Sequence, residues 1–277
     1  MRRATPYLLL VPAVLLLVIF KVYPIVTTLL GGFSCKGQVS LAQYRILFDD
    51  PTFWTSLWVT LKYDIIVNPL QIFAALLLAL LIDAKVPGIR TFRSIYYLPV
   101  PVSLAVSCIL WGQMLSPNNG VVNGVLGLVW ISPQPFLTSV RQALPSIVVI
   151  ASWKGIAYWA IFLLAGLQGI NSEIYEAARI DGANWWNTTW RITVPLLRRV
   201  LIFVTVSDTI ANSLLFVPQF VLTGGGPRLS TNVLMYEAYK SAFSYMDTAR
   251  ANTMITVLLL VIAFFVFMEM KFLKVDY

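Results

Sequence analysis

Six apolar runs of membrane-spanning length constrain the fold of this chain of 277 residues. A helix needs about 20 mostly apolar residues to cross the hydrocarbon core of a bilayer. Hydrophobic residues make up 58% of the chain and charged residues only 12%, whereas soluble domains are roughly one quarter charged. The sequence therefore predicts an all-α integral membrane protein that forms a single domain over residues 1–277. The six expected transmembrane helices are 8–30, 56–82, 95–115, 144–169, 200–222 and 253–272.

The first apolar run has one feature of a secretory signal peptide, because Arg2 and Arg3 precede it. The apolar part of a signal peptide is only about 7–15 residues long and ends at a cleavage site with small residues. This run is longer and contains Pro12, Lys21 and Pro24. We therefore expect it to be a retained transmembrane helix.

The charged residues are distributed unevenly about the predicted spans. With the N-terminus inside, eleven Lys and Arg residues fall on the inner side and six on the outer side. Inner loops of membrane proteins carry an excess of Lys and Arg, so both termini are predicted to be cytoplasmic. These loops account for the net charge of +8, and we expect contact with membrane lipid and no nucleic-acid partner. Lys62 and Asp64 lie near one end of the second span, where snorkelling or a local pair explains them.

Polar side chains also occur deep in the fourth and fifth predicted spans. A charge inside the bilayer costs about 2.5–3.5 kcal/mol on insertion scales and is by default a functional candidate. Lys154 and Tyr158 are four residues apart and share one helix face, as do Asp208 and Asn212. The two stripes are predicted to face one cavity. A buried Lys154–Asp208 pair that only stabilises helix packing is the alternative.

The longest segment between spans on the predicted inner side is 171–199, and its pattern indicates two short helices joined by a turn. Ala177 and Ala178 are small enough to let another surface approach the first helix. Gly182 permits a sharp reversal of the chain. Pro195 suits the first turn of the following helix, where its missing N–H costs nothing.

This inner segment resembles the signature of ABC importer permeases, which is E-A-A, three residues, G, nine residues and I-x-L-P. The matching residues are Glu176, Ala177, Ala178, Gly182, Ile192 and Pro195, with Val194 in place of the usual Leu. In that family the loop forms a coupling helix that docks on a cytoplasmic ATPase. The resemblance implies the type I ABC importer permease fold. It also assigns the coupling role to Glu176, Ala177, Ala178, Asp181, Gly182, Ile192 and Pro195.

Other short motifs resemble the carbohydrate branch of the family, in the order Tyr23-Pro24, Leu98-Pro99 and the turn Thr223–Pro227. Within that branch the chain is similar to the maltose-type first permease subunit, but without a large extracellular insertion. The resemblance implies translocation of a sugar or oligosaccharide. A polyol or a glycerol-phosphate-type solute is the alternative substrate.

The resemblance also places substrate contacts and partners. Transferred residue by residue, the contacts of the maltose-type permease fall on Ala151, Lys154, Gly155, Tyr158, Asp208, Asn212 and Leu215, and three of these seven keep the family's residue type. The implied partners are a second permease subunit in a heterodimer, an ATPase dimer and an extracytoplasmic solute-binding protein. The implied location is a bacterial or archaeal cytoplasmic membrane.

The sequence lacks the residues for several other chemistries. It contains no His, so imidazole bases and His metal sites are excluded. It also lacks the G-x-x-x-x-G-K-[ST] phosphate loop. We therefore expect a chain that is not an enzyme and binds no metal or cofactor, with ATP and Mg²⁺ held by the partner ATPase. An ion-coupled secondary carrier using Lys154 and Asp208 is a further alternative, but it leaves the inner-loop motif unexplained.

Overall fold

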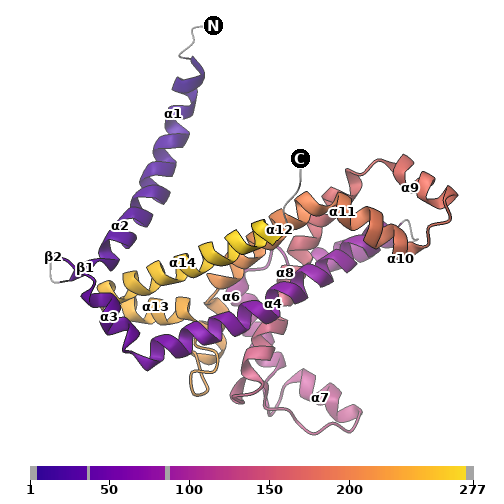
Figure 1. The fold of residues 1–277 in the computed structure, drawn as a ribbon. Coiled ribbons are helices and arrows are strands. Elements are labelled where there is room, and N and C mark those ends of the chain that lie inside the picture. The colour runs from indigo at the N-terminus through magenta and orange to yellow at the C-terminus, as the bar shows by residue number, and fades with distance from the viewer. Residues whose placement is uncertain (1–4, 36–37, 85–87, 273–277) are drawn as a thin grey trace.

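The computed structural model describes residues 5–35, 38–84 and 88–272, and this part of the chain is almost entirely helical (Figure 1). Its strands, β1 Ser34–Cys35 and β2 Gln38–Val39, form a short antiparallel hairpin. Three π-helical turns, Val18–Val22, Thr189–Thr193 and Gln219–Thr223, and one 3-10 turn, Phe136–Thr138, join neighbouring helices. The α-helices are α1 Thr5–Leu17, α2 Tyr23–Gly32, α3 Ala42–Phe48, α4 Pro51–Asp83, α5 Ile89–Tyr97, α6 Leu104–Met114, α7 Val121–Leu128, α8 Ala143–Gln168, α9 Ser172–Ile180, α10 Trp185–Thr188, α11 Val194–Leu196, α12 Arg198–Ser213, α13 Leu234–Phe243 and α14 Thr248–Phe272.

Four helices in the described part of the chain are long and apolar enough to cross a membrane. They are Leu9–Gly32, Pro51–Asp83, Ala143–Gln168 and Thr248–Phe272. Each coincides with a predicted span to within a few residues. The second begins earlier than expected, because the Asp50 side chain accepts a hydrogen bond from the backbone N–H of Thr52 at 2.8 Å and caps the helix.

The other two predicted spans are not continuous helices. In the span 95–115, α5 ends and α6 begins on either side of Pro99 and Pro101. In the span 200–222, α12 ends at Ser213, and a π-helical turn starts after Pro218. Proline cannot donate the backbone hydrogen bond that continues a helix. Each of these apolar runs is therefore divided into two shorter pieces.

The first helix stands apart from the others. It runs from α1 through a π-helical turn into α2, and the turn precedes Pro24, which lacks an N–H. None of its apolar window is buried, and Figure 1 shows it projecting away from the bundle. Its contact with the bundle is made by the end of α2 against α14. There, a Cβ on Gly31 would lie 2.3 Å from the amide of Asn252, and the Thr253 hydroxyl donates to the carbonyl of Gly32 at 3.3 Å.

The core is formed mainly by α4 and α8, which run in the same direction. Residues in the first half of α4 pack on residues in the first half of α8, and the second halves pack on each other. The early contacts involve Val59, Tyr63, Leu144 and Ile147, and the late ones Ala79, Ile82, Leu163 and Leu167. Leu197 and Val204 join the late cluster from the beginning of α12, which therefore runs in the opposite direction. Met254 and Leu258 of α14 pack with Phe53 near the start of α4.

The two ends of the bundle differ. α9 and α10 lie together beyond the last turn of α8 (Figure 1). At the opposite end, α3 and the β-hairpin precede α4, and α7 precedes α8. The predicted inner loop is therefore a folded unit at one end of a parallel helix pair.

Candidate functional site

The predicted inner loop forms a helical hairpin whose first arm is α9. The Asn171 side chain accepts a hydrogen bond from the backbone N–H of Glu173 at 3.1 Å and caps this helix. At the other end, Gly182 has φ +75°, and the backbone N–H of Ala183 donates to the carbonyl of Ala178 at 2.9 Å. This is the helix-ending geometry that a left-handed residue makes. The glycine that was predicted to permit a reversal therefore makes it.

The second arm is formed by α10, a π-helical turn and α11. Asn184 caps α10 by accepting the backbone N–H of Asn187 at 2.9 Å. Pro195 lies in the first turn of α11, as predicted. The hydroxyls of Tyr175 and Thr193 are 3.3 Å apart and join the two arms. The hairpin therefore has its own capping and cross-bracing.

The seven predicted coupling residues do not share one surface. Ala178 is buried and Ile192 is half-buried within the hairpin. The exposed ones are Glu176, Ala177, Asp181, Gly182 and Pro195. Sequence reasoning gave no coupling role to the exposed apolar side chains beside them, Ile180, Trp185 and Trp186. The sequence did contain a signal for these three residues, because large apolar side chains are unusual in a charged loop between membrane spans.

A buried polar layer crosses the bundle between α4, α8, α12 and α14. It lies among helices whose remaining contacts are mostly apolar. Each member is buried or half-buried and forms a side-chain hydrogen bond with another member. The members are Asp64, Asn68, Gln71, Ser152, Trp159, Asp208, Thr209, Asn212, Ser213 and Glu269.

Asn212 is the centre of this polar layer. Its side-chain amide donates to Asn68 Oδ1 at 2.8 Å, to Asp208 Oδ1 at 2.9 Å and, more weakly, to Gln71 Oε1 at 3.3 Å. Asp208 Oδ1 also accepts the indole N–H of Trp159 at 2.5 Å. One amide therefore ties α12 to α4, and Asp208 extends the connection to α8.

Two further chains of hydrogen bonds extend the layer. Asn68 donates to the Thr209 hydroxyl at 3.2 Å, and that hydroxyl donates to Glu269 Oε1 at 2.7 Å. The Ser213 hydroxyl donates to Asp64 Oδ2 at 2.7 Å. Asp64 therefore belongs to the contact between α4 and α12, which corrects the expectation that it snorkels or pairs with Lys62. The Lys62 ammonium lies 5.2 Å from the centre of the Trp58 ring instead.

The three carboxyl groups of the layer have no basic partner among the described residues. Their second oxygens, Asp64 Oδ1, Asp208 Oδ2 and Glu269 Oε2, are buried and accept no hydrogen bond there. The ion pairs found in the described ranges join Arg250 and Lys240 to acidic residues elsewhere in the bundle. Neutral donors thus hold the layer together, which makes it sensitive to the loss of any one donor.

The structure does not contain the Lys154–Asp208 pair that was the alternative prediction. Lys154 is half-buried, and its ammonium donates to the backbone carbonyl of Val102 in the break between α5 and α6. Tyr158, one turn further along α8, is 42% exposed, and its ring meets that of Trp159 edge-on at 4.8 Å. Lys154 and Tyr158 therefore lie away from the buried side of α12 that carries Asp208.

Gly155 and Leu215 have packing roles in the described structure. A Cβ on Gly155 would lie 2.4 Å from Gln71 Oε1, so the glycine permits the close approach of α4 and α8. Leu215 packs on the early cluster of the two helices. The seven predicted substrate contacts are thus divided between an accessible pair, Lys154 and Tyr158, and a packed group behind it that includes the buried Ala151. Asn68, Gln71 and Glu269 were not predicted, although polar residues inside apolar spans were a signal for them.

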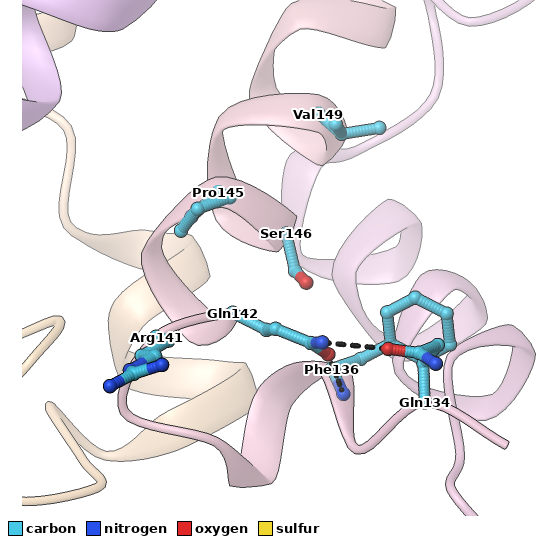
Figure 2. Close-up of a pocket in the computed structure, with 7 residues that line it drawn as sticks. All are labelled: Gln134, Phe136, Arg141, Gln142, Pro145, Ser146 and Val149. Atoms are coloured by element: carbon cyan, nitrogen blue, oxygen red, sulfur yellow. Dashed lines mark hydrogen bonds between the residues drawn. The ribbon is translucent and has the colours of Figure 1, made fainter. Parts of the chain in front are cut away.

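An open pocket of about 250 Å³ lies at the first turn of α8 (Figure 2). The Gln142 side chain closes one side of it, because its amide donates to Gln134 Oε1 at 2.8 Å and its oxygen accepts the backbone N–H of Phe136 at 2.9 Å. None of the predicted substrate residues lines this pocket. Its lining residues are Gln134, Phe136, Arg141, Gln142, Pro145, Ser146 and Val149.

A comparison with known families accounts for the hairpin and the bundle together. The family model described as the binding-protein-dependent transport system inner membrane component matches residues 2–270. The chain belongs to this family. The permease is therefore a multi-pass membrane component of a transport system, as the inner-loop motif predicted.

Relatives and a solved structure match the permease over nearly its whole length. The lactose transport system permease protein LacF of Rhizobium radiobacter is 33% identical over 274 residues, 95% of this chain and 92% of the relative. The sn-glycerol-3-phosphate transport system permease protein UgpA of Brucella suis is 30% identical over 283 residues, 98% and 95% of the two chains. A chain in the crystal structure of a bacterial alginate ABC transporter, bound to a periplasmic protein that carries an alginate pentasaccharide, matches with a TM-score of 0.85. The two are 23% identical, and the match covers 98% of this chain and 96% of that one. This likeness confirms the permease fold.

Proposed function

We propose that the permease is the membrane-spanning subunit of an ATP-driven importer and that the hairpin of α9 and α10 couples it to a separate ATPase. The observation that carries this proposal is the capped, braced hairpin, which exposes Glu176, Ala177 and Asp181 at the end of α8. Because the hairpin is rigid, a displacement of the hairpin by the docked ATPase is transmitted along α8 into the bundle. Because the sequence has no phosphate loop, ATP and Mg²⁺ are assigned to the ATPase dimer.

We further propose a second permease subunit as the membrane partner. The first helix has no buried residue in its apolar window. On α8, Trp153 and Tyr158 are 38% and 42% exposed beside the half-buried Lys154. A cavity between two permeases would place this face of α8 toward the transported solute. In a heterodimer the first helix would pack on the partner.

We infer that the hairpin side and both termini are cytoplasmic, because basic residues are in excess on that side. The opposite end, with α3, α7 and the turn before α13, then faces an external solute-binding protein. This arrangement gives the hairpin access to the ATPase and the cavity access to the delivered solute.

The proposed substrate is a sugar or oligosaccharide. The names of the lactose permease and the alginate transporter support it, as does the accessible ring of Tyr158, since aromatic faces pack well on sugar rings. Lys154 donates hydrogen bonds and suits hydroxyl oxygens. A glycerol-phosphate-type solute is the alternative, because the ammonium of Lys154 also suits a phosphate and UgpA is a relative.

We assign the seven predicted substrate contacts to two roles. Lys154 and Tyr158 touch the solute. The other five pack behind these two side chains and support them: Ala151, Gly155, Asp208, Asn212 and Leu215. The hydrogen bond from Trp159 to Asp208 connects this packed group to Tyr158, because the Trp159 ring contacts the Tyr158 ring. Tyr158→Ala should therefore raise the KM for the solute with little loss of assembly.

The proposed function is tested by purifying the tagged permease from its host in mild detergent and identifying the proteins that accompany it. A stoichiometric ATPase and a second permease are expected. The complex is then reconstituted in liposomes with the binding protein, and uptake of radiolabelled sugars and glycerol phosphate is compared. An ATPase-free oligomer whose uptake is abolished by a protonophore would instead establish an ion-coupled carrier.

The coupling role is tested with Gly182→Pro, which prevents the left-handed turn at the end of α9. We expect insertion in the membrane to persist and sugar uptake to be lost. Gly124→Ala is the matched control, because it lies in a helix and has no atom within 4 Å of the added Cβ. Normal uptake by Gly182→Pro would overturn the assignment of the hairpin.

A further inference from the structure

A charge-free stretch runs through the bundle and reaches its end opposite the hairpin. The 47 residues 94–140 contain no Asp, Glu, Lys or Arg. The stretch includes α6, α7 and the 3-10 turn before α8, and Figure 1 shows α7 projecting from the bundle. A segment that projects into water normally carries charges, because charged residues are rarely buried and dominate exposed loops. We therefore expect the projecting part of this stretch to be surrounded by lipid or by another protein rather than by water.

The position of α7 is fixed by one buried side chain. Asn123 is 8% exposed and donates to the carbonyls of Pro117 and Gln134 at 3.1 and 3.0 Å. Its own carbonyl accepts the backbone N–H of Gln134 at 2.8 Å. Val122 packs beside it against a core cluster that contains Cys108. α7 is therefore held in a defined orientation.

The opposite face of α7 is apolar and exposed. Val121, Val125 and Leu128 are 64%, 57% and 80% exposed, and their spacing puts them on one face. Trp130 follows at 97% exposed. Earlier in the same stretch, α6 also exposes apolar side chains, Ile109 and its neighbours among them.

The backbone directs Trp130 outward at a cost. Its φ is +61°, and the backbone N–H of Ile131 donates to the carbonyl of Leu126 at 3.0 Å. A left-handed residue at this position ends a helix, and glycine is usual there. A side chain in that conformation costs about 1–2 kcal/mol. The chain nevertheless carries its most exposed indole at this point.

We propose that α7 and Trp130 form an interfacial lipid anchor. Val121, Val125 and Leu128 contact the upper acyl chains, and the Trp130 indole lies among the lipid headgroups, the region where tryptophan is enriched in membrane proteins. The lipid surface is favoured over a protein partner because the exposed face has no charge to pair and because α6, which precedes it in a predicted membrane span, also exposes apolar side chains. The anchor requires only that the chain is a membrane protein. Because the proposed function puts the hairpin in the cytoplasm, we assign α7 to the outer leaflet, and this assignment rests on the proposed function.

The test places a fluorescent label on the anchor in the complete transporter, reconstituted in nanodiscs. In a Cys35→Ser, Cys108→Ala background, Leu128→Cys is labelled with an environment-sensitive dye. We expect blue-shifted emission that is quenched by lipids carrying a nitroxide near the headgroup and little affected by aqueous iodide. Arg228→Cys, an exposed charged position in the turn before α13, is the control and should show the reverse.

Either alternative result overturns the proposal. Strong iodide quenching at position 128 means that the segment lies in water, and protection from both quenchers means that protein covers it. Trp130→Gly provides a second measurement, because glycine adopts the left-handed backbone conformation at this position without steric cost. It should fold normally and reduce lipid quenching at position 128 several-fold. Unchanged quenching would exclude Trp130 from the anchor. Because none of these signals depends on transport, they stand or fall separately from the proposed function.

Discussion

The indole nitrogen of Trp159 lies 2.5 Å from Oδ1 of Asp208, and the two side chains join the middle of α8 to the middle of α12. The same oxygen accepts the amide of Asn212, while the other oxygen of Asp208 has no partner among the described residues. This hydrogen bond connects the packed side of the proposed solute wall to the accessible Tyr158 beside it. The first prediction concerns it directly.

Trp159→Phe and Asp208→Leu should each lower the melting temperature of the purified permease and should be coupled in the double variant. The first change removes the indole donor and the second removes the carboxylate acceptor. Each change also alters packing, and the double-mutant cycle subtracts that part from the coupling energy. Polar contacts between membrane helices are worth about 0.6 to 1.7 kcal/mol, and a double-mutant cycle should yield a coupling energy in that range. Tyr158→Phe is the control and should melt like the parent. Additive effects would mean that the two side chains do not act together.

Gly155→Ala should destabilise the contact between α4 and α8. The new methyl would lie 2.4 Å from Gln71 Oε1, and overpacking of a tight core costs about 1–3 kcal/mol. Gln71→Ala in the same chain should recover part of the loss, because it removes the group that clashes. Thermal melting in detergent measures both effects. A parent-like melting temperature for Gly155→Ala would show that the helices separate easily at this point.

Ala177→Leu and Ala178→Leu should differ, although the two residues are adjacent in the motif. Ala178 is buried in the hairpin and Ala177 is exposed. Leu at position 178 should loosen the hairpin and speed trypsin cleavage after Arg179. Leu at position 177 should leave cleavage unchanged but reduce recovery of the ATPase with the permease. Equal cleavage rates for the two variants would contradict the burial seen here.

Lys154→Met should weaken the attachment of α8 to the break between α5 and α6. The change removes the donor to the carbonyl of Val102, and a hydrogen bond from a charged group contributes about 1.5–3 kcal/mol. Lys154→Arg keeps a donor and should melt close to the parent. Lys62→Met, which removes an exposed ammonium from above a Trp ring, is the control. Loss of solute affinity without a change in melting would limit Lys154 to substrate binding.

The sequence was sufficient for the features that depend on local pattern. Apolar length placed four helices, and the composition of the inner loop placed the turn at Gly182 and the helix start at Pro195. These signals are local because a helix or a turn is decided mainly by the residues within it. The helix breaks near Pro99 and Pro218 were not predicted, because the mean hydropathy of a span does not depend on whether one of its residues lacks a backbone N–H.

Which residues meet in the candidate site depends on how each helix is rotated about its own axis relative to its neighbours. The spacing of residues along one helix does not reveal this rotation. Spacing correctly placed Asp208 and Asn212 on one face of α12. It did not show that this face turns toward Asn68 and Gln71 of α4 and away from Lys154. The rotation follows from the packing of four helices at once, in which every buried donor needs an acceptor.

The close packing of Gly31 on Asn252 holds one end of the first helix, and the rest of the helix projects from that point (Figure 1). The helix from Leu9 to Gly32 has 24 residues, a length of about 36 Å at 1.5 Å per residue. A tilt of about 10° at its glycine end therefore moves the other end by about 6 Å, roughly the width of a side chain. The few side chains around Gly31 therefore set where the far end of this helix lies, and a small change in their packing is amplified along its length.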